Sequence, residues 1–275
     1  NVVPMGGVLL TAGVDVQKDR IECEVVAWGR RMQTWSIDYR VFMGDTADLD
    51  GAESPWRQLD EMLAEQWEHE SGVRMSLRVM AIDTGYNTQT VYNWCRKYPN
   101  NRVMPIKGDE HGATLIGQPK PVDVMRNGKR IARGLKLWHI ALDIAKSELY
   151  GWLRQDRPSE DDALLPVGWA RFPEYGEEYF RQLTAEQLVS KVVRGYRRWQ
   201  WEKTRERNEA LDCRVYARAA AAMAGIDRWK EPQWLELERS IGNAQEQPQP
   251  TGDGGTGAQA QQESRGMQRR KSSWL

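Results

Sequence analysis

The segment Val8-Leu9-Leu10-Thr11-Ala12-Gly13-Val14 runs directly into Asp15-Val16-Gln17, and this stretch decides how the chain is interpreted. Its first part is short, nearly continuously apolar and contains β-branched residues, which indicates a strand buried inside a sheet. Asp15 therefore lies at the end of a buried strand. A buried carboxylate is costly unless it is hydrogen-bonded, paired with a cation or bound to a metal, so Asp15 is a candidate functional residue.

Two later segments also place a carboxylate at the edge of an apolar element. The apolar run 77–82 ends on Asp83, and Asp212 lies one turn inside a predicted C-terminal helix, with Glu209 three residues earlier on a similar face. Clustered carboxylate oxygens are the ligands that Mg²⁺ prefers, so Asp15, Asp83 and Asp212 form a candidate metal site. Each carboxylate alone has a simpler interpretation as a turn former or as a residue that favours the helix dipole.

The order of predicted elements indicates an α/β fold with a mixed β-sheet flanked by helices. After the first strand, residues 21–29 and 34–42 alternate between apolar and polar residues, which predicts an antiparallel meander of half-buried strands. Further predicted elements are a helix from Ser54-Pro55 through Trp67, the strand ending at Asp83, a helix capped by Asn87 and a strand over 103–108.

The second half of the chain predicts two hairpins and three helices. The hairpins turn at Asn127-Gly128 and Arg194-Gly195, and the helices cover 137–153, 174–183 and 208–224, the last capped by Asn208 and ended by Gly225. From about residue 240, Gln, Gly, Pro and Ala dominate, a composition typical of disorder. We therefore expect a folded domain over 1–240 and a disordered tail over 241–275.

Bulk composition excludes several classes of protein. The sequence has 39 Lys and Arg against 39 Asp and Glu, so any nucleic-acid surface must come from uneven placement of charge. The sequence has no apolar run of 18 residues, which excludes a membrane-spanning helix. Three distant cysteines without a CxxC motif indicate reduced thiols. The P-loop pattern GxxxxGK[ST] does not occur, so this chain has no P-loop ATPase site.

A basic segment precedes the C-terminal helix and is interleaved with Tyr196, Trp199 and Trp201. Its candidate DNA-binding cations are Lys191, Arg194, Arg197, Arg198, Lys203 and Arg205, and Lys107 is a further candidate for steering the DNA backbone. The alternative is a solvated hairpin whose arginine stems cover tryptophan rings. His139 and Asp143, predicted four residues apart on one helix, are a candidate metal pair, although a simple surface contact is favoured.

Three segments together resemble the nuclease domain of lambda-type phage terminase large subunits. They are Leu10-Thr11-Ala12-Gly13-Val14-Asp15-Val16-Gln17, Ala81-Ile82-Asp83-Thr84-Gly85-Tyr86 and Arg207-Asn208-Glu209-Ala210-Leu211-Asp212-Cys213. The resemblance covers roughly residues 8–230 and implies an RNase H-like fold that binds two Mg²⁺ or Mn²⁺ ions and cuts concatemeric double-stranded viral DNA. By position, it implies that Asp15, Asp83 and Asp212 are catalytic metal ligands, with Glu209 as a candidate fourth ligand.

The same resemblance implies the partners of a DNA-packaging motor in the host cell cytoplasm. These are double-stranded DNA, a terminase small subunit, an ATPase domain that precedes the nuclease, and a portal protein engaged by the tail over 241–275. The missing initiator Met agrees with a fragment of a longer protein. A second hypothesis is a docking module that links motor to portal with little intrinsic cleavage. A recombinase or resolvase of the same fold is a third, but no junction-binding element is apparent.

Overall fold

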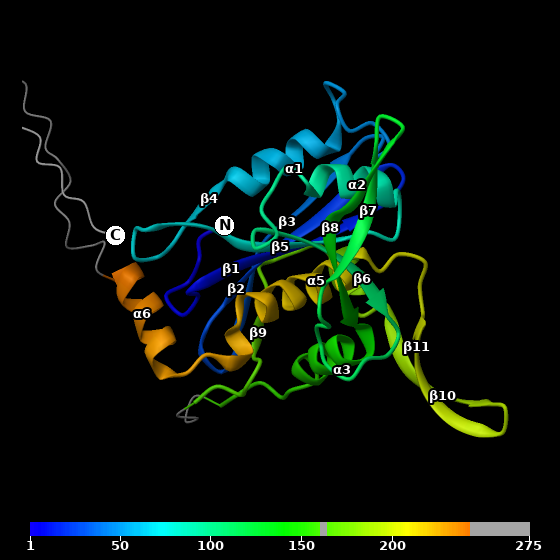
Figure 1. Cartoon of the computed structure of the whole chain (residues 1–275). Helices are drawn as coiled ribbons and strands as arrows, with labels where there is room; N and C mark the ends of the chain where they lie inside the picture. The colour runs from blue at the N-terminus through cyan, green and yellow to red at the C-terminus, as the bar shows by residue number, and fades with distance from the viewer. Residues whose placement is uncertain (160–163, 243–275) are drawn as a thin grey trace, which may run out of the picture.

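The computed structural model describes residues 1–159 and 164–242, so the predicted tail lies almost entirely outside the described residues. Its main element is a nine-stranded sheet in the order β7-β8-β6-β5-β1-β2-β3-β9, with β4 paired to β5 (Figure 1). The strands of this sheet are β1 Leu9–Val16, β2 Arg20–Trp28, β3 Thr34–Met43, β4 Gln66–Glu68, β5 Arg74–Asp83, β6 Val103–Asp109, β7 Lys120–Arg126, β8 Lys129–Ala141 and β9 Ala170–Arg171.

Helices cover both faces of the sheet, with α1 and α2 on one side and α3 and α5 on the other (Figure 1). The helices within the described ranges are α1 Pro55–Ala64, α2 Thr88–Cys95, α3 Leu142–Leu153, α4 Glu177–Leu183, α5 Glu209–Ala224 and α6 Glu231–Gly242. None of them is long and apolar enough to cross a membrane. A separate hairpin, β10 Glu186–Val193 and β11 Tyr196–Lys203, projects at the lower right of the view. These features confirm the predicted fold class.

The central strand β1 fixes the position of two of the predicted site residues. It pairs with β2 in antiparallel register and with β5 in parallel register, with Val14 opposite Ile82. Parallel strands end at the same edge of a sheet, so the next residues along, Asp15 and Asp83, lie side by side at that edge. The predicted meander of the first three strands is also confirmed, because β2 pairs with β3 in antiparallel register.

Helix α5 packs unusually close to β1 because the strand offers it a glycine. Successive residues of a strand point to opposite faces, so Thr11, Gly13 and Asp15 all face α5. The Thr11 hydroxyl donates to the Ala217 carbonyl oxygen at 2.9 Å, and a Cβ on Gly13 would lie only 1.9 Å from the Cys213 carbonyl oxygen. This contact brings Asp15 next to the first turn of α5, where Asp212 lies.

Both predicted hairpins are confirmed at their turns. Asn127 and Gly128 have φ values of 49° and 72°, and Arg194 and Gly195 have φ values of 53° and 83°. Two consecutive positive φ angles are those of a type I′ turn, whose twist matches that of the flanking strands. Ser54 caps α1 as predicted, since its hydroxyl accepts from the Trp56 backbone N–H at 3.3 Å.

Several predicted boundaries were wrong. Residues 137–141 belong to β8 and not to a helix, because the alternating run before Ala141 pairs with β6 from Trp138 onward. Helix α1 ends at Ala64, and Trp67 is in β4, where it pairs with Met75 of β5. Helix α6 was not predicted.

Two predicted caps also differ in detail. Asn87 and Asn208 stand at the starts of their helices, but neither side chain makes a capping hydrogen bond.

Candidate active site

Asp15, Asp83 and Asp212 converge where the carboxyl ends of β1 and β5 meet the start of α5. Asp15 is only 3% exposed. Burial and the neighbouring Asp212 carboxylate raise the pKa of Asp15 to about 8, with Asp83 and Glu209 adding to the shift and a hydrogen bond from Gln17 opposing it. The close packing of β1 on α5 thus assembles a group of like charges in a region that water hardly reaches.

The pKa values of the other two carboxylates are also raised. Burial raises the pKa of Asp212 to about 7, with Lys146 opposing the shift and Asp83 adding to it. Burial also raises the pKa of Asp83, against which the backbone N–H groups of Gly85 and Thr84 act. The phenol of Tyr216 lies within the field of all three carboxylates, which together with burial raise its pKa. The three acids therefore form one electrostatic unit.

Each carboxylate accepts a hydrogen bond from a different polar neighbour. An Asp15 oxygen accepts from the Gln17 side-chain amide at 2.6 Å, Asp83 from the Gly85 N–H at 2.9 Å, and Asp212 from the Asn208 amide at 2.9 Å. In these positions no three His, Cys, Asp or Glu side chains of residues 1–159 and 164–242 are close enough to hold a metal ion. A shared cation would require the carboxylates to turn from these neutral donors toward one another.

Glu209, the candidate fourth ligand, is held by arginine. One of its oxygens pairs with Arg20, and the other lies 3.3 Å from Arg207. Both arginines also contact the fully buried Glu22, at 2.6 Å each. Glu209 therefore lies beside the three aspartates but has its charge neutralised by protein groups.

A polar network behind Asp212 was not predicted from the sequence. The buried Asn208 amide donates to both Asp212 and Glu186, and Glu186 forms a buried ion pair with Lys146 at 2.7 Å. The Lys203 ammonium donates to the Asn208 side-chain oxygen at 2.6 Å. These residues come from α3, β10, β11 and the residue before α5, so only the fold brings them together. The one member of this network that the sequence singles out is Asn208, which was predicted as a helix cap. Its side chain makes no capping hydrogen bond and contacts Asp212 instead.

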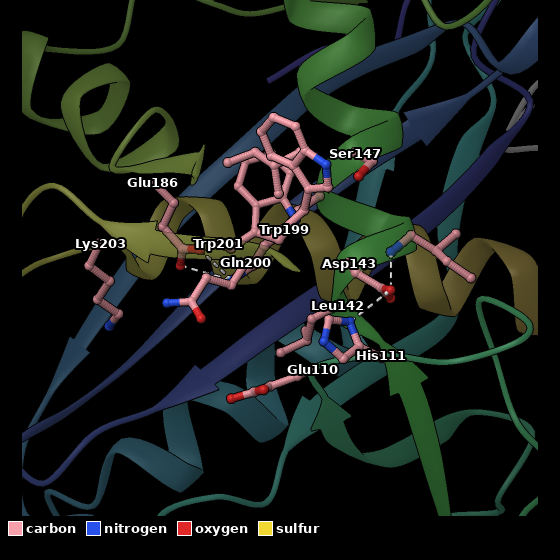
Figure 2. A pocket seen from close by; sticks show the side chains of 13 residues that line it. Glu110, His111, Leu142, Asp143, Ser147, Glu186, Trp199, Gln200, Trp201 and Lys203 are labelled. Carbon is pink, nitrogen blue, oxygen red and sulfur yellow. Dashed lines mark hydrogen bonds and ion pairs between the residues drawn. The ribbon is translucent and has the colours of Figure 1, made fainter. Parts of the chain in front are cut away.

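A pocket of about 840 Å³ opens beside this network, between α3, the β10–β11 hairpin and the residues after β6 (Figure 2). Trp199 and Trp201 line it, and the Trp201 ring stacks on Tyr150 with 4.9 Å between ring centroids. Trp199 is 58% exposed. Lys203 and Glu186 also line the pocket, which connects it directly to the carboxylate network.

The predicted DNA-binding cations divide into two groups. Arg194, Arg197 and Arg198 are exposed on the hairpin and have no ion pair within the described residues. By contrast, Lys191 pairs with Glu202, and Arg205 lies 3.4 Å from Glu178.

Lys107 and Lys203 act on the carboxylates themselves. Lys107, which is exposed on β6, opposes the rise in the pKa of Asp83, and Lys203 does the same for Asp212. One lysine therefore lies near Asp83 and another near Asp212.

The two histidines near this edge pair with different aspartates. His139, in β8, lies 2.9 Å from Asp109, while His111 lies 3.2 Å from Asp143 at the start of α3 (Figure 2). The suggested His139–Asp143 pair is therefore wrong, because residue 139 is in a strand and not in the same helix as Asp143.

Comparison with known proteins identifies the family. Residues 1–234 match the family described as the terminase large subunit gpA, endonuclease domain. The chain is 36% identical over 250 residues to the terminase large subunit of Escherichia phage lambda, and 32% identical over 234 residues to that of Enterobacteria phage P21. The chain belongs to this endonuclease domain family.

The match to the terminase endonuclease domain includes β1, β5 and α5, and with them all three aspartates. The two alignments cover 89% and 83% of this chain but only 36% and 34% of the relatives, so the chain spans about a third of their length. No solved structure gives a significant match.

Proposed function

We propose that this terminase endonuclease domain is a divalent-metal-dependent endodeoxyribonuclease that cuts concatemeric double-stranded viral DNA during packaging. One observation carries the proposal: three aspartates meet at the junction of β1, β5 and α5. Burial raises the pKa of each, and repulsion from a neighbouring aspartate adds to the rise for Asp15 and Asp212. Keeping such a group without a compensating cation costs stability. Mg²⁺ or Mn²⁺ bound to these carboxylates would supply the compensating positive charge.

The donor set fits a pair of such ions. All three side chains supply hard oxygen ligands; Asp15 would contribute to holding both ions, and Asp83 and Asp212 to one each. When bound, such ions would supply an activated water and stabilise the leaving oxygen of a phosphodiester. Glu209 joins the ligand set only if it leaves Arg20 and Arg207.

The protein's own residues position the substrate. Lys107 and Lys203 flank the cluster and would receive the phosphates on either side of the scissile bond. The Asn208 amide holds one Asp212 oxygen at 2.9 Å, and that oxygen would leave this donor if it bound a cation. The exposed arginines 194, 197 and 198 would contact the DNA backbone farther out on the hairpin.

The wider setting of the domain is part of the same proposal and is supported by its membership of the terminase family. We propose a folded nuclease over residues 1–240 and a portal-binding segment over 241–275. The remaining partners would be a terminase small subunit and the ATPase domain of a longer protein, all in the host cytoplasm. A docking module with little cleavage of its own remains the alternative, and no contact among the described residues favours it.

The test is cleavage of supercoiled plasmid by the chain in Mg²⁺, in Mn²⁺ and in EDTA, with Asp15→Asn as the matched variant. We expect nicking that needs the metal and falls at least about 100-fold in the variant, as for the loss of a catalytic group that acts as part of a unit. Equal metal-dependent nicking by the variant would contradict the assigned role of Asp15. A folded wild-type chain that cuts in neither metal would favour the docking module.

A further inference from the structure

The β7–β8 hairpin is strongly basic and plays no part in the site described above. The hairpin contains six exposed cations and a single carboxylate, Asp123, which gives a local charge of +5 in a chain of zero net charge. These cations are Lys120, Arg126, Lys129, Arg130, Arg133 and Lys136. Such uneven placement of charge creates a local positive potential that attracts polyanions.

Most of these cations have no internal partner. Within residues 1–159 and 164–242, only Arg130 forms an ion pair, with Asp123 at 2.8 Å, and the other Asp123 oxygen accepts from the Arg133 backbone N–H. The strand register places Arg126 directly opposite Lys129. Like charges directly across a strand pair are destabilising, so the hairpin keeps a repulsion that a bound polyanion would relieve.

The hairpin is fixed relative to the catalytic edge. The Met125 backbone N–H donates to the Gln89 side chain at 2.8 Å, and the Asn93 side chain donates to the Met125 carbonyl oxygen at 2.9 Å. Gln89 and Asn93 belong to α2, which begins a few residues after Asp83. These two bonds hold the basic turn at a set position with respect to the carboxylate cluster.

A hollow of about 410 Å³ lies between α2 and the turn of the hairpin. The donors that line it are Arg96, Lys97, Arg126, Thr90, Asn93 and Asn127, and Asp50 is the carboxylate among its lining residues. Arginine, lysine, threonine and asparagine side chains are those that contact DNA phosphates. The hollow therefore has the donors for a backbone phosphate beside an exposed basic turn.

We propose that the β7–β8 hairpin and its hollow against α2 form a second site for the phosphate backbone of double-stranded DNA. The identity of the polyanion rests on the proposed nuclease function. In Figure 1 the β7–β8 hairpin extends at the upper right and the β10–β11 hairpin at the lower right, with β6 between them. A duplex bound by both is held on two sides of the carboxylate cluster, through contacts that do not depend on base sequence.

The experiment measures binding of duplex DNA at several salt concentrations, in the chain that carries Asp15→Asn so that no cutting occurs. Arg126→Gln/Lys129→Gln is compared with Arg74→Gln/Arg78→Gln, which removes two exposed cations near the start of β5, away from Asp83. Each lost phosphate contact lowers the slope of log K against log salt by roughly 0.9. We expect the hairpin variant to lose up to about twice this value and the β5 variant to match Asp15→Asn alone.

The outcomes separate this inference from the nuclease proposal. An affinity and a salt slope unchanged in the hairpin variant would overturn the second site and leave the nuclease proposal intact. Weaker binding by the hairpin variant, with no cleavage by the wild-type chain, would support the second site while the nuclease proposal fails. In the catalytically intact chain, the hairpin variant should need more DNA for half-maximal cutting and keep its maximal rate.

Discussion

Two sets of carboxylates between the sheet and α5 are treated in opposite ways. On β2, Glu22 and Glu24 are fully buried, and each is neutralised by arginine. Glu24 accepts from the Arg214 guanidinium at 2.9 Å, and Glu22 from two arginines at 2.6 Å each. Asp15 stands directly opposite Glu22 in the strand register, yet its hydrogen bond comes from the neutral amide of Gln17.

The difference separates structural charge from functional charge. A buried acid that is paired with arginine has its charge neutralised within the fold, while an acid left with neutral donors keeps a raised pKa. The protein evidently has the means to neutralise acids on this face, because it does so one strand away. Among the described residues Asp15, Asp83 and Asp212 have no arginine partner, and in the proposed function a cation from solution would compensate their charge.

The largest predicted effect is on the paired set. Glu24→Gln would leave the Arg214 guanidinium buried beside a neutral amide, and breaking a buried pair in this way costs about 3–5 kcal/mol in the free energy of unfolding. Urea denaturation measures it. The control is Glu65→Gln, which breaks the partly exposed Arg40–Glu65 pair and should cost at most about 1 kcal/mol. Equal losses in both variants would remove the distinction between the two kinds of pair.

The second prediction concerns the contact that brings Asp15 to Asp212. In Gly13→Ala the new methyl group would meet the Cys213 carbonyl oxygen at 1.9 Å, so β1 and α5 must separate. We expect a loss of about 1–3 kcal/mol in stability, as for an overpacked core, together with reduced cleavage.

The control for that variant is Gly151→Ala in α3, where nothing lies within 4 Å of the added methyl group. Alanine favours a helix over glycine by roughly 0.5–1 kcal/mol, so this variant should be as stable as the wild type or more so. Normal cleavage by Gly13→Ala would show that the close strand–helix approach does not set the geometry of the site.

The third prediction is a pH dependence in the absence of divalent metal. The pKa of Asp15 rises from 3.8 to about 8 on folding and that of Asp212 to about 7, so the native state binds more protons than the unfolded state between these values. Stability therefore falls as the pH rises from about 4 to 8. Thermal denaturation in EDTA across this range measures it, and Asp15→Asn should flatten the decline. A stability that rises steadily to pH 8 in the wild type, as ordinary paired carboxylates would give, contradicts the assignment.

These residues also show how far the sequence could be interpreted. The apolar run before Asp15, the Asn127-Gly128 turn and the stop at Gly225 each carry their structural signal within a few neighbouring residues, and each prediction was confirmed. The alternation around Glu22 and Glu24 was taken as a half-buried strand. It was misleading because the Arg214 that neutralises Glu24 lies 190 residues later in the chain.

The site residues likewise divide into those that the local sequence predicts and those that only the packed fold brings together. Asp15, Asp83 and Asp212 could be proposed because each ends or begins an element. The network of Glu186, Asn208 and Lys146 could not, since these residues meet only after α3, β10 and α5 have packed. The strand over 137–141 was missed because a short apolar run fits a helix as well as a strand until its partner β6 is known.

The smallest predicted effect compares unpaired and paired cations at the β10–β11 hairpin. Arg197→Gln/Arg198→Gln removes two cations without an ion pair among the described residues, and we expect the DNA affinity to fall severalfold and the salt dependence to weaken. Arg205→Gln removes a cation that already contacts Glu178 at 3.4 Å, and should change the affinity less. Gel-shift titrations at two salt concentrations decide between them. A larger loss for Arg205→Gln would reverse this order.

The most direct test of the central claim is calorimetric titration of Mn²⁺ into the wild-type chain and into Asp15→Asn, at pH 6 and pH 8 in buffers of different ionisation enthalpy. Metal binding requires deprotonated ligands, so the account predicts binding by the wild type with more protons released at pH 6, and strongly weakened binding by the variant. No Mn²⁺ binding by a folded wild-type chain, or equal binding with equal proton release by both proteins, would contradict the claim that the unpaired aspartates form a cation site.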